Sequence, residues 1–85
     1  MPEEARRPTL RLYGHSYCSL CDVMHAQLLG LAGELGFAVE LVDIHDDADL
    51  EARFGERVPV LWGEAGEICH HHLDEQALRR YVSAA

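Results

Sequence analysis

Hydrophobic and polar positions along this chain change their period several times, and each change predicts an element of secondary structure. Residues 9–13 mix apolar and polar side chains in a short run that stops at Gly14, which is typical of a strand followed by a turn. From Ser19 onward apolar residues recur at steps of three and four, the pattern of an amphipathic helix. Ser19 and Asp22 have the spacing of a capping box, which makes Ser19 the expected N-cap, with a residue one or two places earlier as the alternative, and Gly36 is the expected C-terminal cap.

The next segment completes a strand–helix–strand unit. Residues 37–44 are rich in Val, Ile and Leu and predict a second strand reached directly from the helix. A unit of this kind makes its two strands parallel and places the helix on one face of the sheet. A short acidic helix is then expected, capped by Asp46 or Asp47, ending at Phe54 and followed by Gly55.

The last third of the chain predicts a hairpin and a helix. Residues 58–62 are expected to form a third strand, and residues 67–71 can pair with it across the turn at 63–66. Pro59 has no N–H to donate, so it marks a strand beginning, an exposed edge or a turn with a cis peptide bond. Asp74 can cap a final helix. The predicted order is βαβαββα, an α/β domain over residues 9–85 preceded by a loose polar arm at residues 1–8.

Length, charge and hydropathy restrict the class of protein. The chain has 85 residues, enough for one domain and one core. Fifteen Asp and Glu oppose seven Arg and no Lys, giving a net charge of -8, which is the wrong sign for nucleic acid or an anionic membrane surface. No apolar run is long enough for a signal peptide or a membrane span. We therefore expect a soluble, cytoplasmic and monomeric protein.

Cys18 and Cys21 are the main candidates for chemistry. Two residues separate them, and they lie just after the first strand and at the opening of the first helix. Unpaired N–H groups and the positive end of the helix dipole favour a thiolate at Cys18, whereas Cys21 lies one turn deeper and within bonding distance. One cysteine could thus attack a substrate disulfide and the other resolve the mixed disulfide. The alternatives are two core cysteines or half of a zinc site, which only Cys69 and the histidines could complete.

The element order, the Cys-x-x-Cys pair at the first strand-to-helix turn and the Val58-Pro59 step resemble the glutaredoxin branch of the thioredoxin-fold superfamily, especially small bacterial glutaredoxin-like proteins. The resemblance extends over residues 9–83. It implies a four-stranded mixed sheet flanked by three helices, with Cys18 as nucleophile and Cys21 as resolving thiol. It also implies a cis Val58–Pro59 peptide bond, and a Val58 backbone that binds a peptide-like or glutathione substrate as an added strand.

Several positions depart from the pattern of that family. The usual Cys-Pro-Tyr-Cys is Cys18-Ser19-Leu20-Cys21, the lysine three places before the first cysteine is His15, and the threonine before Val-Pro is Arg57. Residues 69–72, Cys-His-His-His, replace a glycine pair that prepares a helix N-terminus for glutathione. As an imidazolium, His15 could stabilise the thiolate or hold a substrate carboxylate. The residues expected to contact substrate are His15, Tyr17, Arg57, Val58 and Pro59.

Three consecutive histidines suggest a metal site, but the predicted strand argues against one. In a strand His70 and His72 share a face and His71 points away, so we expect a solvated edge hairpin and no metal ligands. Cys69 is expected to be a small buried hydrophobe. Two further groups are expected to have structural roles. They are the aspartates 43, 46, 47 and 49 as helix caps or solvated charges, and the aromatic residues Phe54 and Trp62 as core.

These observations favour a thiol-disulfide oxidoreductase that reduces protein or small-molecule disulfides and holds no bound cofactor. Glutathione or a reductase would recycle the pair. Glutathione recognition should be weak, because its carboxylates need cationic partners and only Arg53 and Arg57 are near the expected cleft. The alternatives are a module that binds a metal or an iron–sulfur cluster through Cys18 and Cys21, and an interaction domain whose cysteines are idle.

Overall fold

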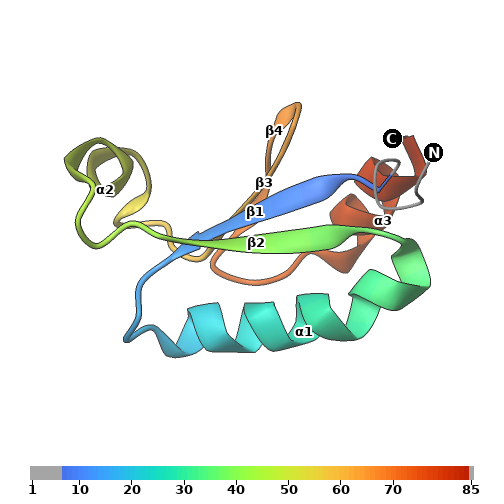
Figure 1. Cartoon of the computed structure of the whole chain (residues 1–85), viewed down its shortest axis with the longest axis horizontal. Helices are drawn as coiled ribbons and strands as arrows, with labels where there is room; N and C mark the ends of the chain where they lie inside the picture. Colours follow the sequence, from blue (N-terminus) through green and yellow to red (C-terminus); the bar gives the residue numbers. More distant parts are fainter. Residues whose placement is uncertain (1–6, 85) are drawn as a thin grey trace.

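The computed structural model describes residues 7–84 and confirms the predicted βαβαββα order (Figure 1). Most of the expected N-terminal arm, residues 1–6, lies outside the described part of the chain, as does residue 85. The elements are β1 (Thr9–Gly14), α1 (Ser19–Leu35), β2 (Ala38–Asp43), α2 (Ala48–Phe54), β3 (Val60–Gly63), β4 (Gly66–His70) and α3 (Glu75–Ala84). None of the helices described is long and apolar enough to cross a membrane.

The strands form one four-stranded mixed sheet, as the resemblance implied, and their order in the sheet is β2-β1-β3-β4. β1 and β2 are parallel, whereas β1 with β3 and β3 with β4 are antiparallel. The parallel register ends with Gly14 opposite Asp43, and the N–H of Ile44 donates to the carbonyl of Gly14 at 3.0 Å. The loops after β1 and β2 therefore leave the same edge of the sheet, which is where α1 and α2 begin.

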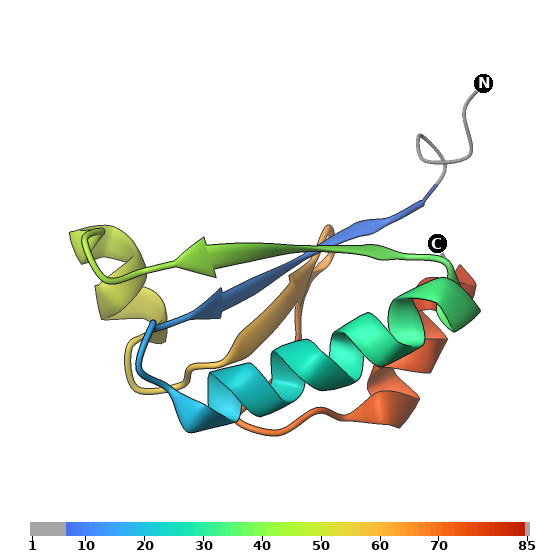
Figure 2. The same ribbon diagram turned by 60° about the horizontal axis from the view of Figure 1, so that its bottom comes forward.

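Successive side chains of a strand point to opposite faces of the sheet, and each face packs into its own hydrophobic cluster. On one face Leu12 of β1 and Leu61 of β3 pack with Met24 of α1 and Leu78 of α3. Figure 2 shows α1 and α3 together on one side of the sheet, with α2 beyond the carboxyl end of β2.

The second cluster forms on the other face, under α2. Tyr13 of β1 and Val60 of β3 pack there with Ile44 and with Phe54 of α2. The rings of Tyr13 and Phe54 stack at 4.5 Å between centroids. The expected core role of Phe54 is confirmed, and partly buried Trp62 packs against the same cluster.

Most predicted helix ends are confirmed. Gly36 caps α1 in the left-handed conformation, with φ 76°. The Asp47 carboxylate accepts the N–H of Leu50 at the start of α2, and Gly55 follows that helix. At α3 the carboxylate of Asp74 accepts the N–H of Ala77 at 3.0 Å.

The N-cap of α1 lies one residue earlier than the capping-box spacing indicates. Cys18 is the N-cap, with an extended backbone and a sulfur that accepts the N–H of Cys21. Its carbonyl also accepts the N–H of Asp22 at 3.1 Å. Ser19 is therefore the first helical residue, and of the predicted N-cap positions the earlier alternative is correct.

The third strand begins two residues later than predicted, at Val60. Pro59 has no N–H for the sheet, although its carbonyl accepts the N–H of His71 at 2.9 Å. Val58 and Pro59 therefore form the approach to β3. The Val58–Pro59 peptide bond is cis.

The expectation that His70 and His72 share a strand face is wrong. β4 ends at His70, and His71 has a positive φ of 64°, so the chain turns between them. Their contacts also differ: His70 Nδ1 lies 2.7 Å from Glu67 Oε2, and His71 Nε2 lies 3.1 Å from the carbonyl oxygen of Glu56. The sequence did not indicate this turn, because a residue other than glycine at positive φ is uncommon.

Candidate active site

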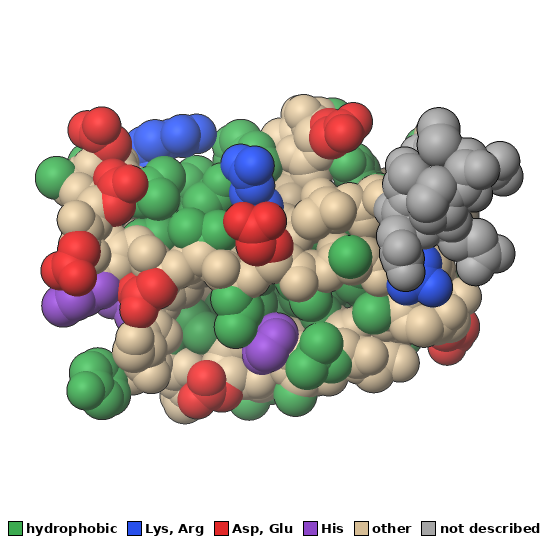
Figure 3. All heavy atoms as spheres, in the orientation of Figure 1, with side chains coloured by type: hydrophobic (Ala, Val, Ile, Leu, Met, Phe, Trp, Pro, Cys, Tyr) green, Lys and Arg blue, Asp and Glu red, His purple; other side chains and the backbone are tan. Residues whose placement is uncertain are grey.

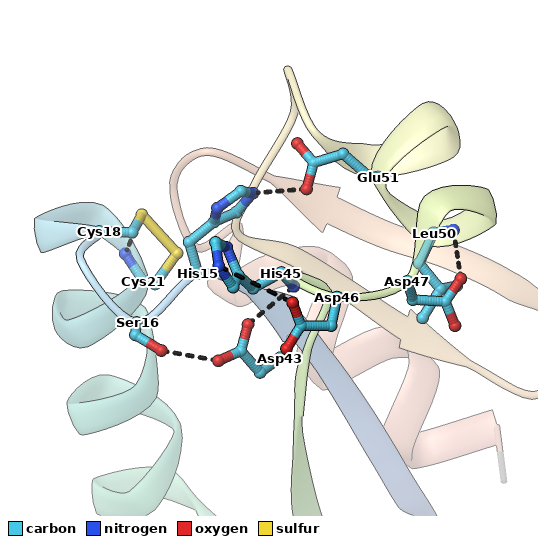
Figure 4. A network of polar contacts seen from close by, with 10 residues as sticks. All are labelled: His15, Ser16, Cys18, Cys21, Asp43, His45, Asp46, Asp47, Leu50 and Glu51. Atoms are coloured by element: carbon cyan, nitrogen blue, oxygen red, sulfur yellow. Dashed lines mark hydrogen bonds and ion pairs between the residues drawn. A yellow bond between two sulfur atoms is a disulfide. The ribbon is translucent and has the colours of Figure 1, made fainter.

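Cys18 and Cys21 meet at the N-terminus of α1. Their sulfur atoms lie at disulfide-bonding distance and their α-carbons are 5.1 Å apart (Figure 4). The N–H of Cys21 donates to the Cys18 sulfur at 3.1 Å. Cys18 is partly exposed, whereas Cys21 is only 7% exposed. A thiol reagent or a substrate can therefore reach Cys18 before Cys21.

A surface hollow lies beside Cys18 and brings several of the predicted residues together. It is lined by His15, Ser16, Tyr17, Cys18, Ser19, Leu20, His45, Gly55 and Val58. Three of the expected substrate contacts, His15, Tyr17 and Val58, are thus on the same surface as the candidate nucleophile. Pro59 is fully buried behind Val58.

The structure does not bring Arg57 to this hollow. Its guanidinium forms an ion pair with Glu67 of β4, whose other carboxylate oxygen faces His70. The guanidinium carbon of Arg53 lies over Phe54, 4.8 Å from its ring centroid, and over Trp62, 5.5 Å from its ring centroid. Both arginines that flank Gly55 are directed to other partners.

Asp43 links the two loops that leave the sheet edge. Its carboxylate accepts a hydrogen bond from the Ser16 hydroxyl at 2.6 Å and another from the N–H of His45 at 2.9 Å. These two hydrogen bonds, that from Ser16 foremost, lower the pKa of the Asp43 carboxyl. The group is therefore a carboxylate at neutral pH, and it holds the loop before Cys18 against the loop before α2.

Two histidines of the hollow each face a carboxylate. His15 Nε2 lies 3.3 Å from Glu51 Oε2, and His45 Nε2 lies 3.9 Å from Asp46 Oδ1. Figure 4 shows these pairs on the side of the disulfide that faces α2. The polar wall beside Cys18 is thus made of imidazoles backed by acidic side chains.

A family model described as Glutaredoxin-like domain (DUF836) matches residues 9–83. The chain belongs to this glutaredoxin-like family. The match spans the same residues as the resemblance inferred from the motifs. Uncharacterized protein Rv0508 of Mycobacterium tuberculosis is 33% identical to this glutaredoxin-like domain over 82 residues, which cover 91% of this chain and 84% of that protein.

Solved structures agree on the fold of the glutaredoxin-like domain. Protein Ne2328 of Nitrosomonas europaea superposes with a TM-score of 0.82 at 31% identity, covering 95% of this chain and 98% of that one. Protein XcR50 of X. campestris has a TM-score of 0.66 at 36% identity, covering 89% and 97%. Thioredoxin 1 of Thermosipho africanus is 16% identical and superposes with a TM-score of 0.61. The match covers 89% of this chain and 96% of the thioredoxin chain. The last likeness concerns the fold alone and shows it to be the thioredoxin fold.

The third cysteine of the glutaredoxin-like domain lies apart from the redox pair. Cys69 is a free thiol of β4 in the core cluster, opposite Leu61, which confirms the expected buried role. Burial raises the pKa of the Cys69 thiol. Within residues 7–84 no three His, Cys, Asp or Glu side chains are grouped so that they could hold a metal ion.

Ser16, His45 and Glu51 were not singled out as site residues from the sequence. Ser16 and His45 follow the carboxyl ends of β1 and β2, which are adjacent parallel strands. Loops at those ends meet at one edge of a sheet, so the predicted βαβ unit was the available signal for them. Of the four aspartates assigned to capping or solvation, Asp47 caps α2, whereas Asp43 bonds Ser16.

Proposed function

We propose that this domain is a thiol-disulfide oxidoreductase that reduces disulfides through Cys18 and Cys21. One observation carries the proposal: a partly exposed sulfur at the N-cap of α1 accepts an N–H and lies at bonding distance from a second, buried sulfur. The hydrogen bond from Cys21 and the positive end of α1 both favour the thiolate of Cys18. Because Cys21 is buried, it does not meet the substrate first and acts in the second step, when it attacks the mixed disulfide at Cys18.

The reaction proceeds by two exchanges. The Cys18 thiolate attacks one sulfur of the substrate, the substrate S–S bond breaks, and one substrate thiol leaves with the electron pair and takes up a proton. The Cys21 thiolate then attacks the Cys18 sulfur, forms the Cys18–Cys21 disulfide and releases the second substrate thiol. Two electrons pass from the dithiol to the substrate. An external thiol, such as glutathione, or a reductase returns the pair to the reduced state.

The hollow beside Cys18 supports a role for its other residues in holding the substrate. Val58 borders it at the approach to β3, where a substrate segment could pair with the backbone in an extended form. Tyr17 and Leu20 also line the hollow and are exposed, so both can contact an apolar part of the substrate. We further propose that the protein is a cytoplasmic monomer and that it binds glutathione weakly.

Single cysteine variants test the mechanism. Cys18→Ser should abolish both mixed-disulfide formation and the reduction of a protein disulfide. Cys21→Ser should still form the mixed disulfide, visible by mass spectrometry, but should not release the product by the dithiol route. Cys69→Ser is the matched control, because Cys69 lies in the core, and it should retain turnover. Full activity in Cys18→Ser, or its loss in a folded Cys69→Ser protein, would exclude this assignment.

If the domain instead binds a metal or an iron–sulfur cluster, the purified protein should contain that metal or cluster. A cluster on Cys18 and Cys21 would need further ligands from a second subunit, because the described part of the chain offers no third side chain grouped with them. Protein purified without oxygen and analysed for metal and for iron–sulfur absorption decides between the two. Stoichiometric metal with no disulfide turnover would favour the binding module.

A further inference from the structure

The charge around Cys18 indicates which disulfides this site accepts. Among the described residues that line the hollow beside Cys18, none is Lys or Arg, and the only basic side chains are His15 and His45. Each of these imidazoles faces its own carboxylate, Glu51 or Asp46. An imidazolium at either position would form a neutral pair with its carboxylate, so neither pair gives the hollow a net positive charge.

Further acidic groups remain when those pairs are set aside. Asp43 is held as a carboxylate beside Ser16, and Asp22 lies exposed in the first turn of α1. The positive end of a helix amounts to roughly half an elementary charge and falls off within its first turn. Asp22 and Asp43, which lie beside His15 and Ser16 of the hollow, add more negative charge to its surroundings than the helix end adds positive charge. The surroundings of the hollow therefore favour a positive substrate, while the N–H of Cys21 still donates to the Cys18 sulfur.

The nearby arginines do not reverse this preference. Arg57 is neutralised by Glu67, and Arg53 lies over the aromatic rings of Phe54 and Trp62. Figure 3 shows acidic side chains gathered over α2 and the loop before it, with histidine beside them, while the basic side chains of that end lie along its upper edge. Because charges are screened beyond about 8 Å at physiological salt, the groups next to the hollow decide the local preference.

We infer that the site acts on disulfides in polypeptide segments that carry lysine or arginine beside the cysteine, and discriminates against anionic disulfides such as oxidised glutathione. This inference rests on the proposed function. The basic side chains of such a segment would face Asp46, Glu51 and Asp43, while its apolar side chains would contact Tyr17 and Leu20. The exchange steps are those given above, and only the charge of the substrate is specified further.

Three synthetic homodimeric peptides test the inference. Each is joined by one interchain disulfide, and they differ only in the two residues beside the cysteine, which are lysine, glutamine or glutamate. The rate at which the reduced protein cleaves each peptide is divided by the rate with uncharged 2-mercaptoethanol, because flanking charges also alter the intrinsic reactivity of a disulfide. At low ionic strength we expect the normalised rate for the lysine peptide to exceed that for the glutamate peptide by roughly tenfold or more. The ratio should fall toward one as salt is added.

Matched variants locate the source of the preference. Asp46→Asn combined with Glu51→Gln removes two carboxylates from the edge of the hollow and should lower the lysine-to-glutamate ratio. Glu40→Gln combined with Glu64→Gln removes the same charge from exposed positions on β2 and in the β3–β4 turn, and should leave the ratio unchanged. Equal losses in the two double variants, or a ratio that survives in the first, would overturn the inference.

The glutamine peptide separates failure of the inference from failure of the proposed function. If the protein cleaves it, but the lysine peptide reacts no faster than the glutamate peptide, the charge preference is wrong and the oxidoreductase assignment stands. If none of the three is cleaved by protein whose Cys18 and Cys21 thiols both titrate, the oxidoreductase assignment itself falls.

Discussion

Gly14 faces Cys21 so closely that a Cβ atom at residue 14 would lie 2.9 Å from the Cys21 sulfur and 3.2 Å from its Cβ. The first of these separations is shorter than real Cβ contacts. The absence of a side chain at the end of β1 therefore lets the first turn of α1 approach the sheet and bury the resolving thiol. The sequence indicated only a turn at Gly14, but its packing role is what ties β1 to the redox pair.

Gly14→Ala should displace Cys21 or the end of β1. Overpacking of this kind costs about 1–3 kcal/mol in the free energy of unfolding. We expect urea denaturation of the reduced protein to show that loss, together with slower formation of the Cys18–Cys21 disulfide. Gly30→Ala is the control, because a Cβ at residue 30 meets no heavy atom within 4 Å. If Gly14→Ala matched wild type in both measurements, the close approach would have no energetic consequence.

Gly36→Ala and Gly33→Ala should have opposite effects on stability. Gly36 has a φ of 76°, where an L side chain costs about 1–2 kcal/mol, so the alanine variant should unfold at lower urea. Gly33 lies exposed within α1 with open space around it, and alanine there should stabilise by about 0.5–1 kcal/mol. Shifts of the urea unfolding midpoint in the same direction for both variants, relative to wild type, would contradict the assigned end of α1.

Alkylation of the reduced protein at neutral pH should label Cys18 first and Cys69 last. Burial raises the pKa of the Cys69 thiol, so little of it is thiolate, and it lies in the core where a reagent cannot reach it. Timed labelling followed by peptide mapping measures the order. In urea the rates should become similar. Labelling of Cys69 ahead of Cys18 in the folded protein would move the reactive thiol to β4.

Asp43→Asn should lower stability at neutral pH and have a smaller effect in acid. The pKa of Asp43 is lowered in the folded protein below its ordinary value of 3.8, so the carboxylate contributes stability above that value. That contribution is lost as pH falls through the folded pKa. Denaturation at pH 7 and near pH 2 should show the difference shrinking, and Ser16→Ala should behave in the same direction. A constant difference at both pH values would assign the effect to packing and not to charge.

Local patterns were sufficient for the elements and for the position of the redox pair. The caps Gly36, Asp47 and Asp74 act on backbone groups within a few residues, and the periods of the apolar positions separate strands from helices. The βαβ connection also determined that β1 and β2 are parallel. Cys18 and Cys21 could be placed together because one helical turn brings them within reach.

Tertiary structure decided the partners of side chains that are far apart in the sequence. Ser16 meets Asp43 only because β1 and β2 pair in a register that ends both strands at one edge. Arg57 was a candidate substrate contact, but it forms an ion pair with Glu67 of β4. Such pairs depend on strand register and side-chain direction over tens of residues, whereas sequence periodicity reports only which face a residue occupies. The sequence by itself therefore determined the scaffold and the reactive cysteines, and the folded arrangement determined the charge that surrounds them.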